Sequence, residues 1–283
     1  MSGTMGGVAQ VLAGHPLDTV KVRLQTQVPV PGQPPQFNGM IDCFKKTVQH
    51  EGFKGLYKGA MSPLAGAMAH NAGIFFFYGQ SKKIVAAKKN IHLADLTPKD
   101  YFTAGAMTGF CVNIVECPVD LLKCKLQAQV GKGQYAGVWD CFKQLYRLRG
   151  IQGVYQGLPA TTLRNVPCFA SYFYAFEMVK QFLTKKGEKP TLSTIFLAGG
   201  AAGFGFWGIW YPLDIIKTRL QTDATLPQDR KYSSTLDCVV KMMKTEGGAA
   251  FWRGWVPSIV RAIPINASVF LAVNATKRFV FGD

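Results

Sequence analysis

The sequence predicts an all-α membrane protein with threefold pseudosymmetry, and three observations support this fold class. A motif of the form Pro, x, Asp, x, x, Lys, x, Lys or Arg, x, Gln occurs three times at nearly equal intervals, starting at Pro16, Pro118 and Pro212. Such an internal repeat indicates one body built from three similar units. Two stretches, 59–81 and 190–213, contain no Lys, Arg, Asp or Glu and are long enough to span a bilayer.

Each unit begins with a helix rich in small residues that leads into the motif. These helices carry glycines four residues apart, a spacing that lets helices approach closely in lipid. The three pairs are Gly3 and Gly7, Gly105 and Gly109, and Gly199 and Gly203. The motif proline then removes a backbone hydrogen bond, so we expect a kink at this point of each helix.

A polar loop and a short amphipathic helix follow the motif, and the chain then turns into a second long helix. The short helices open at 37–43, 135–141 and 232–238, and the turns lie at 51–59, 149–157 and 246–254. This order of elements, repeated three times, predicts six transmembrane helices and three short helices along one surface. The repeats are 1–90, 91–186 and 187–283, within one structural domain.

Composition restricts the function. The net charge of +16 predicts anionic partners, but nucleic acid is excluded because the basic residues are spread between apolar stretches and form no recognised motif. The seven cysteines have no C-x-x-C or metal spacing, which indicates structural thiols in a reducing compartment and no metal site. No cleavable signal peptide is expected at the start. Nothing in the motifs indicates an enzyme or a cofactor.

The triplicated motif, with an aromatic-basic-Gly turn after each copy, resembles the mitochondrial carrier family over the whole chain. The segments GHPLDTVKVRLQTQ and EGFKGLYKG are most similar to the carnitine/acylcarnitine and basic amino acid branch. The resemblance implies a multi-pass solute carrier of the mitochondrial inner membrane that works by alternating access around one central site. It also implies short helices on the matrix side and both termini on the intermembrane-space side.

A matrix gate is implied by the same resemblance. The Asp and Lys of each motif lie three residues apart on one helical face, and each Asp is expected to pair with the Lys of the next repeat. The pairs are Asp18 with Lys123, Asp120 with Lys217, and Asp214 with Lys21. The motif glutamines, Gln25, Gln127 and Gln221, resemble braces across these pairs. The alternative is ordinary surface pairs within each helix, worth only ~0.5 kcal/mol each.

The corresponding cytoplasmic gate is incomplete. In this family it consists of an aromatic residue, an acid and a lysine on each even-numbered helix. The candidates here are Tyr78, Lys82, Phe176, Glu177, Lys180 and Lys277. Gly79 and Asn274 replace two of the three acids, so we expect a weak outer gate and a preference for an outward-open state.

The family's substrate-contacting positions fall on Gly66 with Ala67, Arg164 with Asn165, and Arg261. Arginines suit carboxylate recognition, because a guanidinium donates two parallel hydrogen bonds; the alternative is that they pair with helix ends or reach the membrane surface. His70, Asn71 and Glu116 are further candidates for the cavity lining. His15 fits the carnitine-type motif, and a packed histidine explains it equally well.

Asn165 stands where carnitine and amino acid carriers tend to have an acid, which makes the substrate uncertain. A carboxylate with an uncharged body fits the contact positions, as in a keto or other carboxylic acid. Carnitine, acylcarnitine or an amino acid fits if Glu116 binds the positive nitrogen. The rival interpretation is a carrier fold retained as an accessory subunit of a larger inner-membrane complex, rather than a monomeric carrier.

The turns and short-helix starts resemble the family's cardiolipin sites, and cardiolipin is the one bound molecule expected. Backbone N–H groups at helix starts bind lipid phosphate, and nearby basic residues add attraction. The candidates are Gly39, Tyr57, Lys58, Gly59, Gly137, Gly157, Trp252, Arg253 and Gly254. Gln156 and Ser234 depart from this pattern, which predicts weaker second and third sites. Aromatic anchoring at the bilayer interface explains the turn aromatics equally well.

Overall fold

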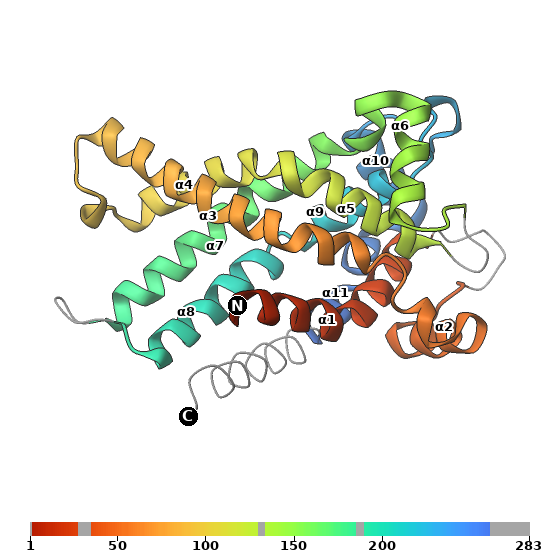
Figure 1. Cartoon of the computed structure of the whole chain (residues 1–283), viewed down its shortest axis with the longest axis horizontal. Coiled ribbons are helices and arrows are strands. Elements are labelled where there is room, and N and C mark those ends of the chain that lie inside the picture. The colour runs from red at the N-terminus through yellow and green to blue at the C-terminus, as the bar shows by residue number, and fades with distance from the viewer. Residues whose placement is uncertain (1, 28–34, 130–133, 185–189, 261–283) are drawn as a thin grey trace. The chain divides into compact units, whose positions relative to one another are not determined.

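The structure, a computed structural model, describes residues 2–27, 35–129, 134–184 and 190–260. Within these ranges the regular elements are helices (Figure 1). Repeat 1 contains α1 (Ser2–Thr26), α2 (Met40–Gly55) and α3 (Met61–Lys89), and repeat 2 contains α4 (Pro98–Cys111), α5 (Asn113–Ala128), α6 (Val138–Val154) and α7 (Leu158–Leu183). Repeat 3 contains α8 (Leu192–Trp207), α9 (Tyr211–Thr222), α10 (Thr235–Glu246) and α11 (Trp255–Val260). Short 3₁₀ turns lie at Leu93–Asp95, Pro227–Asp229 and Gly248–Trp252.

The chain forms two compact units, each assembled from more than one repeat. Unit 1 consists of 1–69, 117–157 and 215–283, and unit 2 of 70–116 and 158–214. The boundaries fall inside α3, α5 and α9. Each of these three helices therefore continues from one unit into the other.

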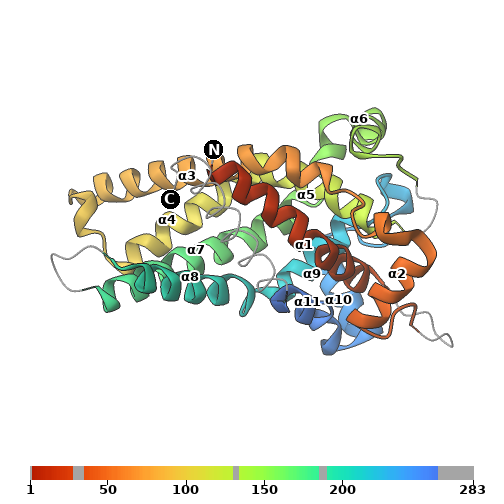
Figure 2. The same ribbon diagram turned by 60° about the horizontal axis from the view of Figure 1, so that its bottom comes forward.

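In unit 2, α7 packs against both α4 and α8 (Figure 2). The small residues of α4 explain the close approach, since a Cβ added at Gly105 or Gly109 would lie 2.5 or 2.4 Å from a carbonyl oxygen of α7. The ring of Tyr78 stacks on Phe173 with 3.6 Å between centroids. On α8, no described atom lies within 4 Å of a Cβ added at Gly199 or Gly203, so the described residues show no close approach at this pair. It is Gly205 that faces α7, with its added Cβ 3.1 Å from Ser171 O.

In unit 1, the motif helices pack on the short helices through equivalent apolar clusters. The repeat 1 cluster consists of Val20, Leu24, Phe37, Cys43 and Leu56. Its repeat 2 counterpart consists of Leu121, Leu122, Leu126, Tyr135, Cys141 and Leu145. Cys43 and Cys141 occupy corresponding places, and all seven cysteines are free thiols. The thiols of these clusters therefore serve as small packed side chains.

The turn glycines have positive φ and contact the motif helix of the next repeat. Gly59 and Gly157 have φ of 79° and 81°, values that side chains rarely tolerate. A Cβ added at Gly59 would lie 3.1 Å from Leu126 Cβ, and one at Gly157 would lie 2.9 Å from Gln221 Cγ. Glycine is therefore needed here both for the turn and for the packing of one repeat on the next.

The expected proline kinks occur differently in each repeat. α1 is helical through Pro16, α4 and α5 meet at 57° around Val112, and residues 208–210 separate α8 from α9 just before Pro212. The ring of a proline clashes with the carbonyl four residues earlier, which accounts for the breaks upstream of Pro118 and Pro212, whereas the expected kink is not seen as a break in α1. Across the described ranges, the bent pair α4 and α5 has the length and apolar composition of a membrane span, whereas no individual helix does. The six spans remain a prediction.

Candidate functional site

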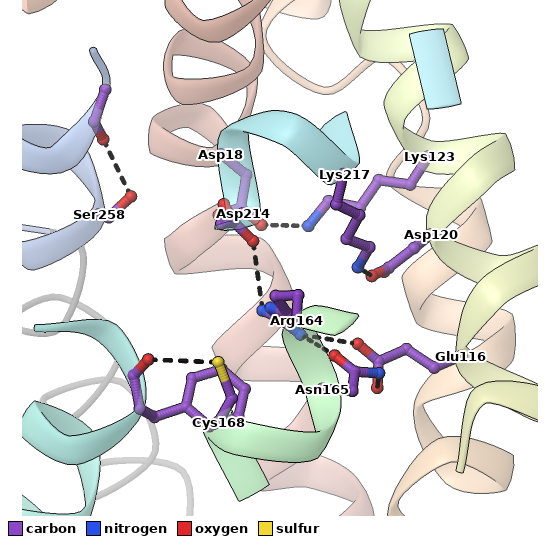
Figure 3. A network of polar contacts seen from close by, with 12 residues as sticks. Asp18, Glu116, Asp120, Lys123, Arg164, Asn165, Cys168, Asp214, Lys217 and Ser258 are labelled. Atoms are coloured by element: carbon purple, nitrogen blue, oxygen red, sulfur yellow. Dashed lines mark hydrogen bonds and ion pairs between the residues drawn. The ribbon is translucent and has the colours of Figure 1, made fainter. Parts of the chain in front are cut away.

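Arg164 is the centre of a buried polar network in unit 2 (Figure 3). Its Nη1 lies 3.1 Å from Glu116 Oε1, and its Nη2 lies 3.3 Å from Asp214 Oδ1. The three side chains are each less than a tenth exposed. Unpaired charges are costly in such surroundings, so the two carboxylates stabilise the guanidinium in place.

Glu116 has further partners on other helices. Its Oε2 accepts a hydrogen bond from Asn165 Nδ2 at 3.0 Å and lies 3.3 Å from His70 Nε2. Asn165 also donates to Asn113 Oδ1 at 2.6 Å and accepts from Arg164 Nη1 at 2.5 Å. The candidates Arg164, Asn165, Glu116 and His70 are thus brought together in one network.

Aromatic rings of α8 cover the guanidinium of Arg164. Its Cζ lies 4.7 Å from the ring centroid of Phe206 and 5.3 Å from that of Trp207. A cation gains ~0.5–2 kcal/mol over such rings. Such rings can also contact the positively charged or apolar part of a ligand. The sequence analysis did not identify Phe206 or Trp207 as site residues.

The sequence offered Glu116 as the replacement for the acid that is absent at Asn165. The carboxylate of Glu116 on α5 contacts both Arg164 and Asn165. The sequence placed Glu116 one turn before Asp120, but helical spacing alone cannot show which side chains of α7 it reaches. Of the remaining candidates, Gly66, Ala67 and Asn71 are described only as part of the α3 backbone, and Arg261 lies outside the described residues.

Two of the three expected gate pairs are present in unit 1. Lys123 Nζ binds Asp18 Oδ2, and Lys217 Nζ binds Asp120 Oδ2. Each pair joins the motif helices of consecutive repeats. Their role as a gate stays a prediction, and the Asp214–Lys21 pair stays one as well.

The brace expected of Gln127 is replaced by other contacts. Its side-chain amide donates to Thr19 Oγ1 at 3.2 Å and lies 3.1 Å from His15 Nε2. Thr19 is the residue that follows Asp18, so the amide contacts a neighbour of the ion pair and not the carboxylate itself. Lys58 O lies 2.9 Å from the same His15 nitrogen, and the His15 ring stacks on Tyr57. His15 is therefore a packed histidine. Gln25 and Gln221 are fully buried near the ends of α1 and α9.

The cytoplasmic-gate candidates that the structure describes lie in unit 2. The acid, Glu177, pairs with Lys180 on the same helix. The Lys180 ammonium also lies 5.6 Å from the Phe176 ring centroid, and the Lys82 ammonium lies 4.7 Å from that of Tyr78. Lys277 lies outside the described residues. These contacts join neighbouring turns of one helix, in keeping with the shortage of acids.

The second basic residue of each motif forms a ring that sequence reasoning missed. Arg23, Lys125 and Arg219 each donate to backbone carbonyls at the end of the next repeat's motif helix, at distances of 2.7–3.4 Å. The acceptors are Gln127 and Gln129, then Asp223, then Gln25 and Gln27. Carbonyls at a helix C-terminus lack partners within the helix and attract cations. The threefold recurrence of this residue was the available signal.

Repeat 2 lacks the acid that binds the second basic residue of the motif in the other two repeats. Glu51 accepts from Arg23 and pairs with Lys58 at 2.6 Å, and Glu246 likewise holds Arg219 and Arg253. At the corresponding positions repeat 2 has Arg149 and Gln156. Gln156 instead donates its amide to three carbonyls near the end of α9, those of Leu220, Asp223 and Ala224.

Three of the lipid-site candidates line one cavity in unit 1. A cavity of about 310 Å³ is lined by Gly39, at the start of α2, and by Arg253 and Gly254 of repeat 3. No side chain caps the N-terminus of α2 or of α6, which follow Gly39 and Gly137. At the start of α10, the Ser234 hydroxyl accepts a hydrogen bond from Asp237 N; a weaker third lipid site stays a prediction. Gly59 and Gly157 lie against the next motif helices.

Comparison with known proteins identifies relatives along the whole chain. The family model described as "Mitochondrial carrier protein" matches residues 1–89, 94–187 and 188–283. A mitochondrial carnitine/acylcarnitine carrier-like protein of Arabidopsis thaliana is 40% identical over 98% of this chain and 96% of its own. Mitochondrial magnesium exporter 1 of Drosophila melanogaster is 39% identical over 98% and 92%. A mitochondrial basic amino acids transporter of Bos taurus is 36% identical over 100% and 92%.

Proposed function

This chain belongs to the mitochondrial carrier family, and we propose that it carries a small metabolite that bears both a carboxylate and a positively charged nitrogen. Family members are transporters of the mitochondrial inner membrane, so the chain is a transport protein and not an enzyme. The substrate class that we propose is that of carnitine and acylcarnitine, with basic amino acids as the second candidate.

The position of Glu116 carries this proposal. A carboxylate that contacts both Arg164 and Asn165 supplies the acid that the contact positions themselves lack. Two carboxylates, Glu116 and Asp214, surround one guanidinium, so the described part of the site has more acid than a simple carboxylate substrate needs. A zwitterion matches it, because its carboxylate binds Arg164 and its cationic nitrogen binds an acid beside the rings of Phe206 and Trp207.

Magnesium, named for one relative, fits this network less well. Mg²⁺ requires several oxygen ligands in octahedral geometry. Here the fixed positive charge of Arg164 lies between the two carboxylates and opposes a second cation. In the described ranges, no group of three or more His, Cys, Asp or Glu side chains has a metal-binding arrangement.

The gate pairs support the proposal that transport occurs by alternating access. The Asp18–Lys123 and Asp120–Lys217 pairs join motif helices of successive repeats and must break for the cavity to open to the matrix. As the family resemblance implies, we propose that six helices span the membrane. The short helices then lie on the matrix side, and both termini lie on the intermembrane-space side. The Asp214–Lys21 pair completes the proposed ring.

Exchange in liposomes tests the proposal. Purified carrier in cardiolipin-containing liposomes loaded with carnitine should exchange external carnitine, acylcarnitine or arginine faster than malate or choline, which carry only one kind of charge. Glu116→Gln should lower the rate for the zwitterions by roughly 10- to 100-fold, the value of one charge-assisted contact of ~1.5–3 kcal/mol. Glu177→Gln, an acid of α7 outside the network, is the matched control.

Two results would contradict the proposal. Equal exchange of malate and carnitine would show that the cationic nitrogen is not recognised. The absence of exchange of any carboxylate or carnitine ester, together with co-purification at fixed stoichiometry with a large complex, would favour the accessory-subunit interpretation.

A further inference from the structure

Lys125, near the end of α5, carries a buried positive charge with which no acid side chain pairs in the part of the chain that the structure describes. The residue is 5% exposed, and its ammonium donates to the backbone oxygen of Asp223 at 2.7 Å. An ammonium has three N–H donors, so this contact leaves donors for a further acceptor. A buried cation that binds a carbonyl alone is less stable than one that also binds an anion.

The other two repeats show what the position beside Lys125 normally holds. The guanidinium of Arg23 binds the carboxylate of Glu51, and that of Arg219 binds the carboxylate of Glu246. The corresponding residue of repeat 2 is Arg149, which has the opposite charge. Repeat 2 therefore has two basic residues where repeats 1 and 3 have a buried ion pair.

Arg230, in the segment that follows α9, adds a third positive charge to this part of unit 1. Its Nε and Nη2 donate to the backbone oxygens of Ala224 and Thr225, each at 3.2 Å. Burial lowers the pKa of Arg230 below its ordinary value, the charge of Arg149 lowers it further, and Asp223 acts in the opposite direction. The two guanidinium groups therefore repel each other, and an anion beside them relieves this repulsion.

A cavity of about 400 Å³ lies beside Lys125, within unit 1. Its lining includes Lys125, Tyr135 and Leu148 of repeat 2 and the segment 222–226 of repeat 3. The volume is typical of the smaller sites that bind small molecules. Tyr135 and Thr225 bring hydroxyl groups to the lining, and a hydroxyl group can donate a hydrogen bond to an anion. The cavity is separate from the one lined by Gly39 and Arg253.

Two acids, Asp223 and Asp229, line the same cavity, and neither takes the place of the missing glutamate. The Asp223 carboxylate accepts hydrogen bonds from the backbone N–H groups of Ala224, Lys231 and Tyr232 at 2.9–3.1 Å. Its charge is therefore stabilised by the loop that it holds. Asp229 is exposed, so water and salt screen its charge. Lys125 is thus the buried charge of the lining that lacks a counter-charge.

We propose that this cavity binds a phosphate group, which takes the place that the carboxylates of Glu51 and Glu246 have in the other repeats. The phosphate oxygens accept hydrogen bonds from Lys125, and Arg149 and Arg230 add attraction. A phosphate suits this setting better than a carboxylate, because it carries more charge and guanidinium groups recognise it well. The phosphate can belong to a small soluble metabolite or to the headgroup of an anionic lipid.

The consequence of binding is a tighter joint between repeats 2 and 3. A ligand on Lys125 and Arg230 connects the end of α5 to the segment after α9, which Lys125 and Gln156 already hold through backbone oxygens. The site lies in unit 1, whereas the network around Arg164 lies in unit 2. The inference therefore does not depend on which substrate the carrier transports.

Melting temperatures in detergent test the site with inorganic phosphate as the probe. The parent, Arg149→Glu and Arg147→Glu are titrated with sodium phosphate and, at equal ionic strength, with sodium chloride. Arg149→Glu restores the acid that repeats 1 and 3 have at this position. Arg147→Glu makes the same change of charge two residues earlier on α6, at an exposed position, and is the matched control.

Phosphate should raise the melting temperature of the parent and of Arg147→Glu more than chloride does. In Arg149→Glu the phosphate concentration for half of the maximal effect should rise roughly tenfold or more, because the new carboxylate occupies Lys125 and repels the probe. Without phosphate, Arg149→Glu should melt at a higher temperature than the parent, since a buried charge gains its partner. Lys125→Gln, which removes the buried charge, should also lose the response to phosphate.

The same four proteins titrated with cardiolipin distinguish the two sources of the phosphate. A response to inorganic phosphate that is lost in Arg149→Glu and kept in Arg147→Glu supports a soluble ligand. A response to cardiolipin alone that Arg149→Glu reduces more than Arg147→Glu does supports a lipid headgroup. If both probes act on the parent, Arg149→Glu and Arg147→Glu alike, they bind elsewhere or as an adventitious ion only, and the inference is overturned. Stabilisation of the parent by neither probe overturns it as well.

Discussion

Asp18 of α1 and Lys123 of α5 form an ion pair between repeats 1 and 2, with side chains 10% and 17% exposed. Replacing one partner leaves an uncompensated charge in a largely buried place, which costs more than the pair itself contributes. Exchanging both partners restores the attraction with opposite polarity. The pair is therefore suited to a charge-reversal experiment.

We expect the double variant Asp18→Lys with Lys123→Asp to retain more exchange activity than either single variant. Initial rates in liposomes, normalised to the amount of folded carrier, provide the measurement. The same cycle with Asp120 and Lys217 should behave alike. Equal loss of activity in both single variants and the double variant would show that the pair does not act as a unit.

Arg253→Ala should reduce the stabilisation that cardiolipin provides. Arg253 and Gly254 line the cavity that also contains Gly39 at the uncapped start of α2, and a basic side chain near lipid phosphate contributes about 1 kcal/mol. Arg253 also binds Glu246, so the variant should melt at a lower temperature even without lipid. The informative quantity is the further rise on adding cardiolipin.

Lys241→Ala is the control, because it also removes an ion pair of a basic residue in repeat 3, with Asp237, and Lys241 does not line this cavity. A smaller cardiolipin effect in Arg253→Ala than in Lys241→Ala supports the site at Arg253. If the lipid stabilises Arg253→Ala as much as the parent, the phosphate binds elsewhere.

Gly109→Ala should destabilise the protein by about 1–3 kcal/mol, the usual cost of overpacking. The added Cβ would lie 2.4 Å from Asn165 O, so α4 and α7 have to separate and Asn165 has to move. The Cβ added by Gly203→Ala, at the corresponding place in repeat 3, meets no described atom within 4 Å, so this variant should be neutral or stabilising, since Ala favours helix by about 1 kcal/mol. Similar melting temperatures for the two variants would contradict the close packing of α4 on α7.

Thiol alkylation should be slow in the folded protein at the buried cysteines of the short helices. Burial raises the pKa of Cys43 from 9.0 to about 11, and that of Cys141 and Cys238 to about 12. At pH 8 the thiolate fraction is then roughly a hundredth or less of that in the unfolded chain, and the thiolate is the reactive form. The raised pKa favours the folded state fully below pH 9.0, and this contribution is lost as pH rises toward 11–12.

Maleimide labelling at pH 8, followed peptide by peptide by mass spectrometry, checks this expectation. The same three cysteines labelled after denaturation provide the reference rate. Labelling of Cys141 in the folded protein at the reference rate would contradict its burial in the cluster with Leu121 and Leu145.

The sequence indicated the ion-pair partners but not the network around Arg164. The threefold motif, combined with the family resemblance, predicted Asp18–Lys123 and Asp120–Lys217, because periodicity shows which residues share a helical face. It could not show that Asp214, identical in its motif, contacts Arg164. That contact depends on α7, a helix outside the motif.

Glu116 and Gln127 also show that the sequence did not identify which side chains of a facing helix a residue contacts. Glu116 was noted for its place one turn before Asp120, and its contacts with Arg164 and Asn165 depend on how α5 packs on α7. Gln127 was expected to bind a charged pair, yet Thr19 and His15 occupy its amide. Spacing along a helix does not choose between adjacent polar partners on the facing helix.

The contacts of Arg23, Lys125 and Arg219 with carbonyls also bear on whether a single repeat can fold without the other two. Each motif helix is terminated by a side chain from another repeat, in the cyclic order repeat 1 to 2, 2 to 3 and 3 to 1. A separately produced repeat would keep its basic residue without the acceptors and its final carbonyls without the donor. Truncation or splitting of the gene between repeats should therefore yield fragments that persist only when all three are produced together and reassemble.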